Sequence, residues 1–263
     1  MIDLNTNEIV LLVLSGVLVG IINTLGGGGS VITMSLFMAM NMPIGIANGT
    51  NRIAVLLQNL SATVAFLRKG MLHLKSGLLL SLPAILGNIL GAIVATDVSD
   101  TVFKVCLSVV LVIILIYLAL GKDKEQVTGG HGLCIKWWHY LLFFIIGFYG
   151  GYIYIGLGFL ILAIAIWTMN LDIVTANVIK GFVIFLSTPF ALAVFIYNDQ
   201  IWWEHGLLHA AGNIVGALLA SHWAMSWGVK FVRWFTLVVI VVFFADLVGW
   251  ISLQEMLKCL ITI

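Results

Sequence analysis

Three features of this sequence have the chemistry to bind an anion. Residues 26–29 are four consecutive glycines, followed by Ser30, inside a stretch that is otherwise apolar. Glycine permits positive φ and lets backbone N–H groups approach a small ligand closely, and the N-terminus of a helix presents such groups to anions. Arg52 and Lys180 lie in other apolar stretches, and neither has an acidic residue three or four positions away. These two cations predict a mobile anion as their missing partner.

The same residues also fit structural roles, which the sequence leaves open. Small residues let membrane helices approach closely, and two glycine pairs with GxxxG spacing are best explained in this way: Gly16 with Gly20, and Gly87 with Gly91. A long cationic side chain can reach a membrane interface, or pair with a distant Asp or with the C-terminal end of a helix. Packing explains the four consecutive glycines poorly, because each costs about 1 kcal/mol relative to alanine in a helix.

A second interruption occupies the corresponding place in the later part of the chain. The segment YIYIGLGF, residues 152–159, separates two apolar legs, as the glycine run does earlier. Half-helix ends that meet near the middle of a membrane form substrate sites in many transporters. We therefore predict that both breaks bind the substrate, and that Ser30 caps the helix after the first break. The predicted substrate-binding residues are Asn23, Thr24, Gly26, Gly27, Gly28, Gly29, Ser30, Asn51, Arg52, Tyr154, Gly156, Gly158, Asn177 and Lys180.

Two further pairs of polar residues have uncertain roles by sequence alone. His205 and His209 are spaced like a metal-binding pair beside Glu204, but they lie outside an HExxH motif. We expect them near a membrane interface, and we expect no metal and no other cofactor. Asn88 and Asn213 occupy equivalent places in repeated GNIxGA stretches. They either line a pathway or tie helices together by hydrogen bonds.

Composition indicates the class of protein. Of 263 residues, 62% are hydrophobic and 9% are charged, whereas about a quarter of the residues of a soluble domain are charged. Several apolar runs reach the ~20 residues that cross a bilayer as a helix, and β-barrel alternation is absent. We predict an all-α, multi-pass membrane protein. The net charge of +1 argues against a nucleic-acid partner, and the absence of a GxSxG motif argues against an enzyme.

The chain contains two copies of one unit. GNILGA at 87–92 returns as GNIVGA at 212–217, and the dipeptide Ala-Asn at 47–48 returns at 176–177. Ordered matches at a nearly constant offset indicate a duplication. We therefore divide one transmembrane transporter domain, residues 1–263, into repeat one (8–120), a cytoplasmic linker (121–137), repeat two (138–251) and a short C-terminal tail (252–263).

Loop charges predict that the two copies have opposite orientations. Lys and Arg accumulate on the cytoplasmic side of a membrane. The loop at 67–76 is basic and its counterpart at 198–206 is acidic, whereas 96–104 is mainly acidic and 226–233 is basic. Inversion requires an odd number of crossings, so we predict three transmembrane helices per copy, a re-entrant opening segment, and both termini outside. The legs of each opening segment, about 15 and about 11 residues, are too short to cross alone. Eight spans in two parallel repeats are the alternative.

The glycine run with Ser30, then Pro43, then ANGTN at 47–51 resembles the TauE/SafE family of sulfite and organosulfonate exporters. The resemblance covers essentially the whole chain, although the second half carries a degenerate version of the motif. It implies a secondary transporter of the bacterial inner membrane that exports small sulfur-containing anions such as sulfite or sulfoacetate. The alternatives are a metal or cation permease that uses the histidines, and a transporter of another small anion. The expected partners are the anion and the bilayer, and a homo-oligomer is compatible with the sequence.

Overall fold

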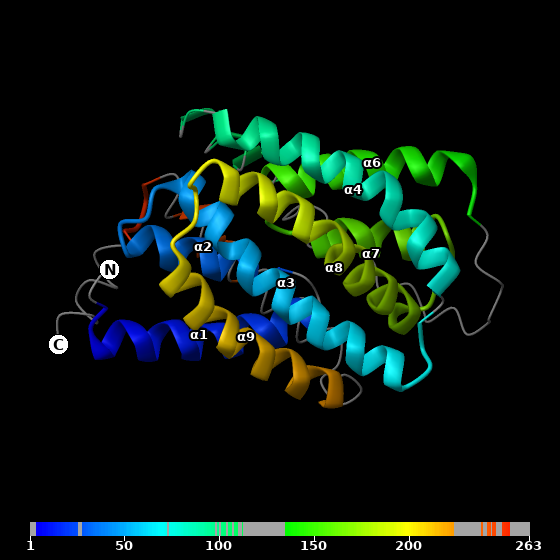
Figure 1. Ribbon diagram of the computed structural model, residues 1–263, viewed down its shortest axis with the longest axis horizontal. Coiled ribbons are helices and arrows are strands. Elements are labelled where there is room, and N and C mark those ends of the chain that lie inside the picture. The colour runs from blue at the N-terminus through cyan, green and yellow to red at the C-terminus, as the bar shows by residue number, and fades with distance from the viewer. Residues whose placement is uncertain are drawn as a thin grey trace.

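The computed structural model describes residues 4–25, 28–72, 74–97 and 135–223, with shorter pieces between 99 and 112 and between 238 and 252. All regular secondary structure in these residues is helical (Figure 1). This confirms the prediction of an all-α protein. We call the described residues up to 112 the first half, and residues 135–223 the second half.

Each half begins with an interrupted pair of helices and continues with two long ones. The first half contains α1 (Thr6–Leu25), α2 (Ser30–Ala39), α3 (Ile44–Arg68) and α4 (Leu74–Asp97). The second half contains α6 (Trp137–Tyr152), α7 (Leu157–Trp167), α8 (Ile173–Tyr197) and α9 (Trp203–Trp223). The two predicted interruptions therefore separate α1 from α2 and α6 from α7.

One predicted leg length is wrong. α1 has 20 residues, and at 1.5 Å per residue it extends about 30 Å, which is enough to cross the hydrocarbon layer alone. The sequence prediction was shorter because it ended the apolar leg at the charged residue Glu8 and the polar residues near it, which form the first turn of α1. α6 has 16 residues, and α2 and α7 have 10 and 11. These three helices agree with the prediction and are too short to cross alone.

Side-chain hydrogen bonds cap the starts of α1 and α8. At the start of α1, Asn5 Oδ1 accepts a hydrogen bond from the Glu8 N–H, and Glu8 Oε2 accepts one from the Asn5 N–H, both at 2.8 Å. This reciprocal pattern is a capping box. At the start of α8, Asp172 Oδ1 accepts from the N–H groups of Val174 and Thr175, both at 3.0 Å. The caps satisfy N–H groups that have no partner within the helix.

The outer surface of the helices is apolar. Among the described residues, three helices are long and apolar enough to cross a membrane, namely α1, α4 and residues Val174–Tyr197 of α8. One face of α4 exposes a leucine at every turn: Leu78, Leu82, Leu86 and Leu90. The same helix buries Asn88. An exposed apolar face with a buried polar residue is expected where lipid is the solvent, so the protein is a multi-pass membrane protein.

Glycines on both helices allow α1 to pack against α9. A Cβ atom on Gly16 or Gly20 would overlap a backbone carbonyl oxygen of α9. A Cβ atom on Gly212 or Gly216 would likewise overlap a carbonyl oxygen of α1. The two backbones are therefore in direct contact, as in small-residue interfaces of membrane helices.

The contact between α4 and α6 has the same construction. A Cβ atom on Gly87 or Gly91 would overlap carbonyl oxygens of α6, and one on Gly147 or Gly151 would overlap carbonyl oxygens of α4. This confirms the prediction that the GxxxG-spaced glycines serve helix packing. In both contacts, the opening helix of one half packs on the last long helix that the structure describes in the other half.

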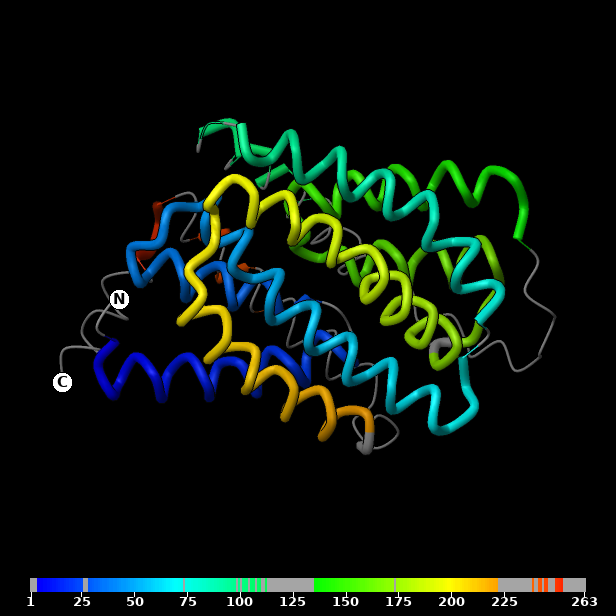
Figure 2. The backbone as a smooth tube through the Cα atoms, viewed as in Figure 1, coloured from blue at the N-terminus to red at the C-terminus, as the bar shows by residue number. Residues whose placement is uncertain are grey.

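The interrupted pairs run in opposite directions along the molecule. α1 begins, and α2 ends, at the end of the molecule where the N-terminus lies (Figure 1). α6 begins, and α7 ends, at the opposite end, close to the connection between α3 and α4. The tube in Figure 2 shows that each pair returns to the end where it began. α3 and α8, which follow these pairs, pack against each other.

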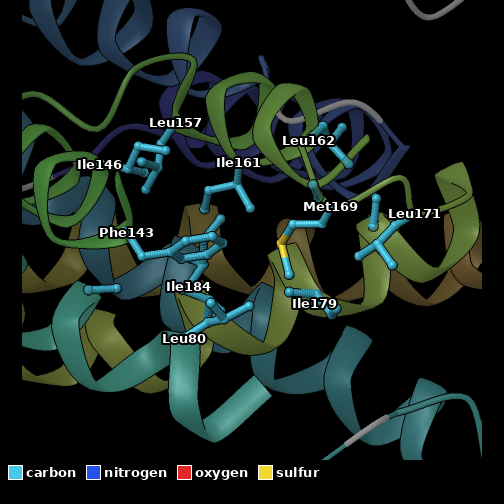
Figure 3. Close-up of a cluster of buried hydrophobic side chains, with 14 of the residues drawn as sticks. Leu80, Phe143, Ile146, Leu157, Ile161, Leu162, Met169, Leu171, Ile179 and Ile184 are labelled. Atoms are coloured by element: carbon cyan, nitrogen blue, oxygen red, sulfur yellow. The ribbon is translucent and has the colours of Figure 1, made fainter. Parts of the chain in front are cut away.

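A core of apolar side chains surrounds α7. The ring of Phe143, from α6, lies near Leu80 of α4, Ile161 of α7 and Ile184 of α8 (Figure 3). All four side chains are buried. A short helix that is apolar on all faces is stable only when other helices surround it. This core therefore holds the second leg of the later break inside the protein.

Candidate functional site

The break between α6 and α7 contains two residues with left-handed backbone. Tyr154 has φ 69° and Gly156 has φ 73°. Gly156 is the N-cap residue of α7, and no side chain caps this helix. Glycine adopts this conformation without strain, which explains its presence there. The hydroxyl group of Tyr149 donates a hydrogen bond to the Ile155 carbonyl oxygen and so holds the break against α6.

Arg52 binds the C-terminal end of α6. Its Nη1 donates to the carbonyl oxygen of Gly150, and its Nη2 donates to that of Gly151 at 2.9 Å and to Asn48 Oδ1 at 2.9 Å. Asn48 Nδ2 donates at 2.9 Å to the carbonyl oxygen of Tyr152, the last residue of α6. The last carbonyl groups of a helix have no partner within it. Arg52 and Asn48 supply partners for three of them.

Lys180 binds the C-terminal end of α1 in the same way. Its Nζ donates to the carbonyl oxygens of Asn23 at 3.0 Å and Thr24 at 3.3 Å, and to Asn177 Oδ1 at 2.7 Å. Both cations are buried, Arg52 with 0% and Lys180 with 3% of its surface exposed. Of the roles that the sequence left open, pairing with a helix C-terminus is therefore the one observed. A second role in substrate binding stays a prediction.

Gln58 of α3 also holds the first break. Asn23 Nδ2 donates to Gln58 Oε1 at 3.3 Å, and Gln58 Nε2 donates to Thr24 Oγ1 at 3.4 Å. Gln58 lies six residues after Arg52, which is about 9 Å along the axis of α3. α3 thus contacts both breaks, one through Arg52 and the other through Gln58.

The predicted site residues form two groups. Asn23, Thr24, Asn177 and Lys180 meet at the end of α1, whereas Arg52 and Tyr154 meet beside the end of α6. The guanidinium carbon of Arg52 lies 4.9 Å from the centre of the Tyr154 ring. Gly158 is buried in the first turn of α7. Gly26 and Gly27 lie outside the described residues.

Two expectations for the first break are wrong. Gly29 has φ −64°, so it does not use the left-handed conformation. Gly29 is required for space instead, because a Cβ atom there would lie 2.8 Å from the Val19 carbonyl oxygen. Ser30 is the first residue of α2 and makes no capping hydrogen bond. The N-cap position is occupied by Gly29, one residue earlier than predicted.

Four buried polar groups of residues predicted to bind substrate have no protein partner. Arg52 Nε, Asn51 Nδ2 and Ser30 Oγ can donate a hydrogen bond, whereas Asn23 Oδ1 can only accept one. An unpaired buried donor costs about 1–3 kcal/mol. Each of the three donors can therefore gain a hydrogen bond when an anion arrives.

The buried charges are all positive in the described part of the chain. Arg52 and Lys180 are buried, and no Asp or Glu is buried among the described residues. Burying a cation without an anion is costly. The helix ends that bind the two cations supply only partial negative charge, about half an elementary charge each. The interior of the described residues therefore favours an added anion.

Sequence reasoning missed two residues of this region. Asn48 and Gln58 hold the breaks through hydrogen bonds but were not among the predicted site residues. Asn48 could have been found from the internal sequence similarity, because its counterpart Asn177 was among the predicted substrate-binding residues. Gln58 follows Arg52 in the same apolar stretch and could extend a polar face, but its partners, Asn23 and Thr24, are more than thirty residues away.

His205 and His209 are both buried inside the protein, and their position near a membrane interface stays a prediction. His205 is 2% exposed and His209 is 0% exposed. His209 Nδ1 donates to the Leu12 carbonyl oxygen at 3.0 Å, and its Nε2 lies 3.0 Å from Thr33 Oγ1. His209 therefore ties α9 to both α1 and α2. Within the described residues, no three His, Cys, Asp or Glu side chains are grouped as metal ligands.

The equivalent asparagines make different contacts. Asn88 Nδ2 donates at 2.8 Å to the Ser187 carbonyl oxygen and so ties α4 to α8. Asn213 Nδ2 donates at 2.9 Å to the His209 carbonyl oxygen within α9. The Oδ1 atom of each is buried without a partner. Asn88 therefore serves helix association, one of its two predicted roles.

Comparison with known proteins identifies relatives along nearly the whole chain. The family described as sulfite exporter TauE/SafE matches residues 12–247. A probable membrane transporter protein, ORF9, of Sinorhizobium sp is 28% identical over 231 residues, covering 88% of each chain. A probable membrane transporter protein of Haemophilus influenzae is 26% identical, covering 88% of this chain and 91% of its own.

A more distant relative extends over a longer alignment. The probable membrane transporter protein YfcA of Escherichia coli is 24% identical over 257 residues, covering 92% of this chain and 90% of its own. No solved structure matches this chain. The similarity therefore reaches both breaks and all the described helices.

Proposed function

We propose that this chain, which belongs to the sulfite exporter TauE/SafE family of membrane transporters, exports small sulfur-containing anions. Sulfite, sulfoacetate and related organosulfonates are the proposed substrates. The name of the family supports sulfite as a substrate. The names of the relatives support membrane transport but mention no substrate. The family consists of transporters rather than enzymes.

The observation that carries this proposal is the charge of the interior. Two cations are buried and no carboxylate is buried in the described residues. A cation permease needs the opposite arrangement, because a mobile cation is stabilised by buried carboxylates or by a cluster of metal ligands. The described residues contain neither. Anion transport is therefore the better supported of the two functions.

The proposed binding site lies at the two breaks. α2 and α7 both begin there without a side-chain cap. The N–H groups of Val31, Ile32, Leu157 and Phe159 already donate to backbone carbonyl oxygens. The backbone groups proposed to bind an anion are therefore the N–H groups of Ser30 and Gly158. Arg52 Nε, Asn51 Nδ2 and Ser30 Oγ are unpaired and can add hydrogen bonds to its oxygen atoms. The other predicted site residues, including Gly26 and Gly27, are proposed to shape the same region.

We also propose that the two halves are inverted repeats, residues 8–120 and 138–251, joined by a cytoplasmic linker at 121–137. The opposite directions of the interrupted pairs support this arrangement (Figure 1). The glycine contacts support it as well, because each joins the opening helix of one half to the last long helix described in the other. Inverted repeats place a substrate site near the membrane midplane.

Flux measured in proteoliposomes tests the substrate. The purified protein should release sulfite or sulfoacetate from loaded vesicles, and faster when the interior is negative. Sulfate and chloride, compared in the same vesicles, should be released more slowly. Equal release of all four anions would contradict selectivity for sulfite and sulfonates, and release of none would contradict the proposal.

Two variants test the site without disturbing the fold. Ser30→Ala and Asn51→Leu remove groups that have no partner in the protein, so the melting temperature should stay close to that of the wild type. Each should raise the sulfite concentration for half-maximal flux about fivefold or more. A fivefold change corresponds to the loss of one hydrogen bond worth about 1 kcal/mol. Ser81→Ala is the control, because Ser81 Oγ already donates to the Gly77 carbonyl oxygen in its own helix.

A further inference from the structure

Each of the two buried cations binds a helix end in the half of the protein to which it does not belong. Arg52 belongs to α3 in the first half, and it binds the end of α6 in the second half. Lys180 belongs to α8 in the second half, and it binds the end of α1 in the first half. Each cation also bonds an asparagine one turn earlier in its own helix, Asn48 or Asn177.

The chemistry of the contacts is the same on both sides. The C-terminal end of a helix carries unpaired carbonyl groups and a partial negative charge. At the membrane interior, where water is scarce, such groups need partners from the protein. A buried guanidinium or ammonium group supplies both hydrogen bonds and an opposite charge. The two cations therefore stabilise the ends at which α1 and α6 are interrupted.

We infer that Arg52 and Lys180 form a pair of crossed caps, through which each half holds the broken helix of the other half in position. Each break is held in part by a cation from the other half. A movement of one half relative to the other therefore shifts the break that its cation holds. The consequence for transport rests on the proposed function, because the anion is proposed to bind at these breaks.

The two caps differ in the number of hydrogen-bond donors that remain. An ammonium group has three donors, and all three of Lys180 are used by Asn23, Thr24 and Asn177. Arg52 keeps Nε unpaired. Lys180 is therefore a positioning residue that acts through the end of α1, whereas Arg52 both positions α6 and keeps its Nε–H group available for an anion.

Hydrogen–deuterium exchange of the detergent-solubilised protein, measured without any anion, tests the crossed arrangement. Lys180→Met should speed exchange about tenfold or more in residues 20–25 of the first half and leave residues 147–152 unchanged. Arg52→Met should do the reverse. Lys180→Arg and Arg52→Lys should restore protection, because each keeps a charged donor in reach of the carbonyl groups.

The control is Lys75→Met, which removes the same charge from an exposed position at the start of α4 and should change neither segment. If a Met variant does not fold, the conservative variants still decide by where exchange changes. Any faster exchange caused by Lys180→Arg must fall in residues 20–25, and any caused by Arg52→Lys must fall in residues 147–152. Faster exchange in the half that carries the substitution, or equally in both segments, would overturn the inference. Absence of sulfite flux in the wild type would count against the proposed function only, because the exchange pattern is measured without the anion.

Discussion

The guanidinium group of Arg52 lies over two aromatic rings, with its central carbon 4.9 Å from the centre of the Tyr154 ring and 5.4 Å from that of the Phe195 ring. Tyr154 is one of the two left-handed residues of the second break. A buried cation beside an aromatic face gains electrostatic stabilisation from the ring. Arg52 is therefore fixed by the carbonyl oxygens of α6 and by the two aromatic rings.

This contact predicts an effect of ring removal at position 154. Tyr154→Leu should lower the free energy of unfolding by about 1–2 kcal/mol, because it removes the ring beside a desolvated cation. Tyr154→Phe keeps the ring and should lose less. Thermal unfolding in detergent measures the difference. Equal destabilisation by both variants would assign the effect to the hydroxyl group instead of the ring.

The packing of α4 on α6 predicts a strong dependence on small residues. Gly91→Ala places a methyl group on the Phe148 carbonyl oxygen, so it should lower the free energy of unfolding by about 1–3 kcal/mol through the forced separation of the helices. Gly45→Ala is the matched control in α3, since its nearest neighbour, the Gln200 side chain, lies 3.6 Å away. Similar melting temperatures for both variants would contradict direct backbone contact.

The cap of α8 predicts a dependence of stability on acid. Burial raises the pKa of Asp172, but hydrogen bonds from Thr175 and Val174 lower it by more. The pKa therefore lies below its ordinary value of 3.8. Because the folded-state pKa is lower than the unfolded one, the carboxylate stabilises the protein above the unfolded pKa. This stabilisation is lost as the pH falls through the folded pKa.

Substitution at Asp172 separates the cap from its charge. Asp172→Ala should cost about 1 kcal/mol at neutral pH and remove this acid-dependent contribution. Asp172→Asn should keep most of the cap and also remove the pH dependence. Melting temperatures measured between neutral pH and pH values below 3.8 check both. A wild-type acid response in the Asn variant would show that other groups cause it.

The inverted arrangement predicts the sides on which two loops are labelled. Single cysteines at positions 72 and 200, introduced into a cysteine-free protein, should react with an impermeant thiol reagent from opposite sides of the membrane. Position 72 should be cytoplasmic, because Lys and Arg surround it. Reaction of both positions from the same side would favour parallel repeats. A cysteine at position 125 in the linker should react from the same side as position 72.

Composition and local spacing were enough to predict the fold class of the protein and the places of its helix breaks. The scarcity of charge and the long apolar runs predicted a helical membrane protein, and the interruptions at residues 26–29 and 152–159 were visible as polar or glycine-rich breaks. The spacing of Gly87 and Gly91 predicted close packing, because residues four apart share one face of a helix. It did not identify α6 as the partner helix.

The partners of the buried cations became visible only in the folded protein. The sequence left open whether Arg52 and Lys180 bind an anion, a distant Asp or a helix end. Their partners, such as Gly151 and Asn23, are 99 and 157 residues away along the chain. The contacts of His209 were hidden for the same reason, since they come from α1 and α2. Local spacing reports which residues share a helix face, whereas the electrostatic surroundings of a buried group depend on which helices fold against it.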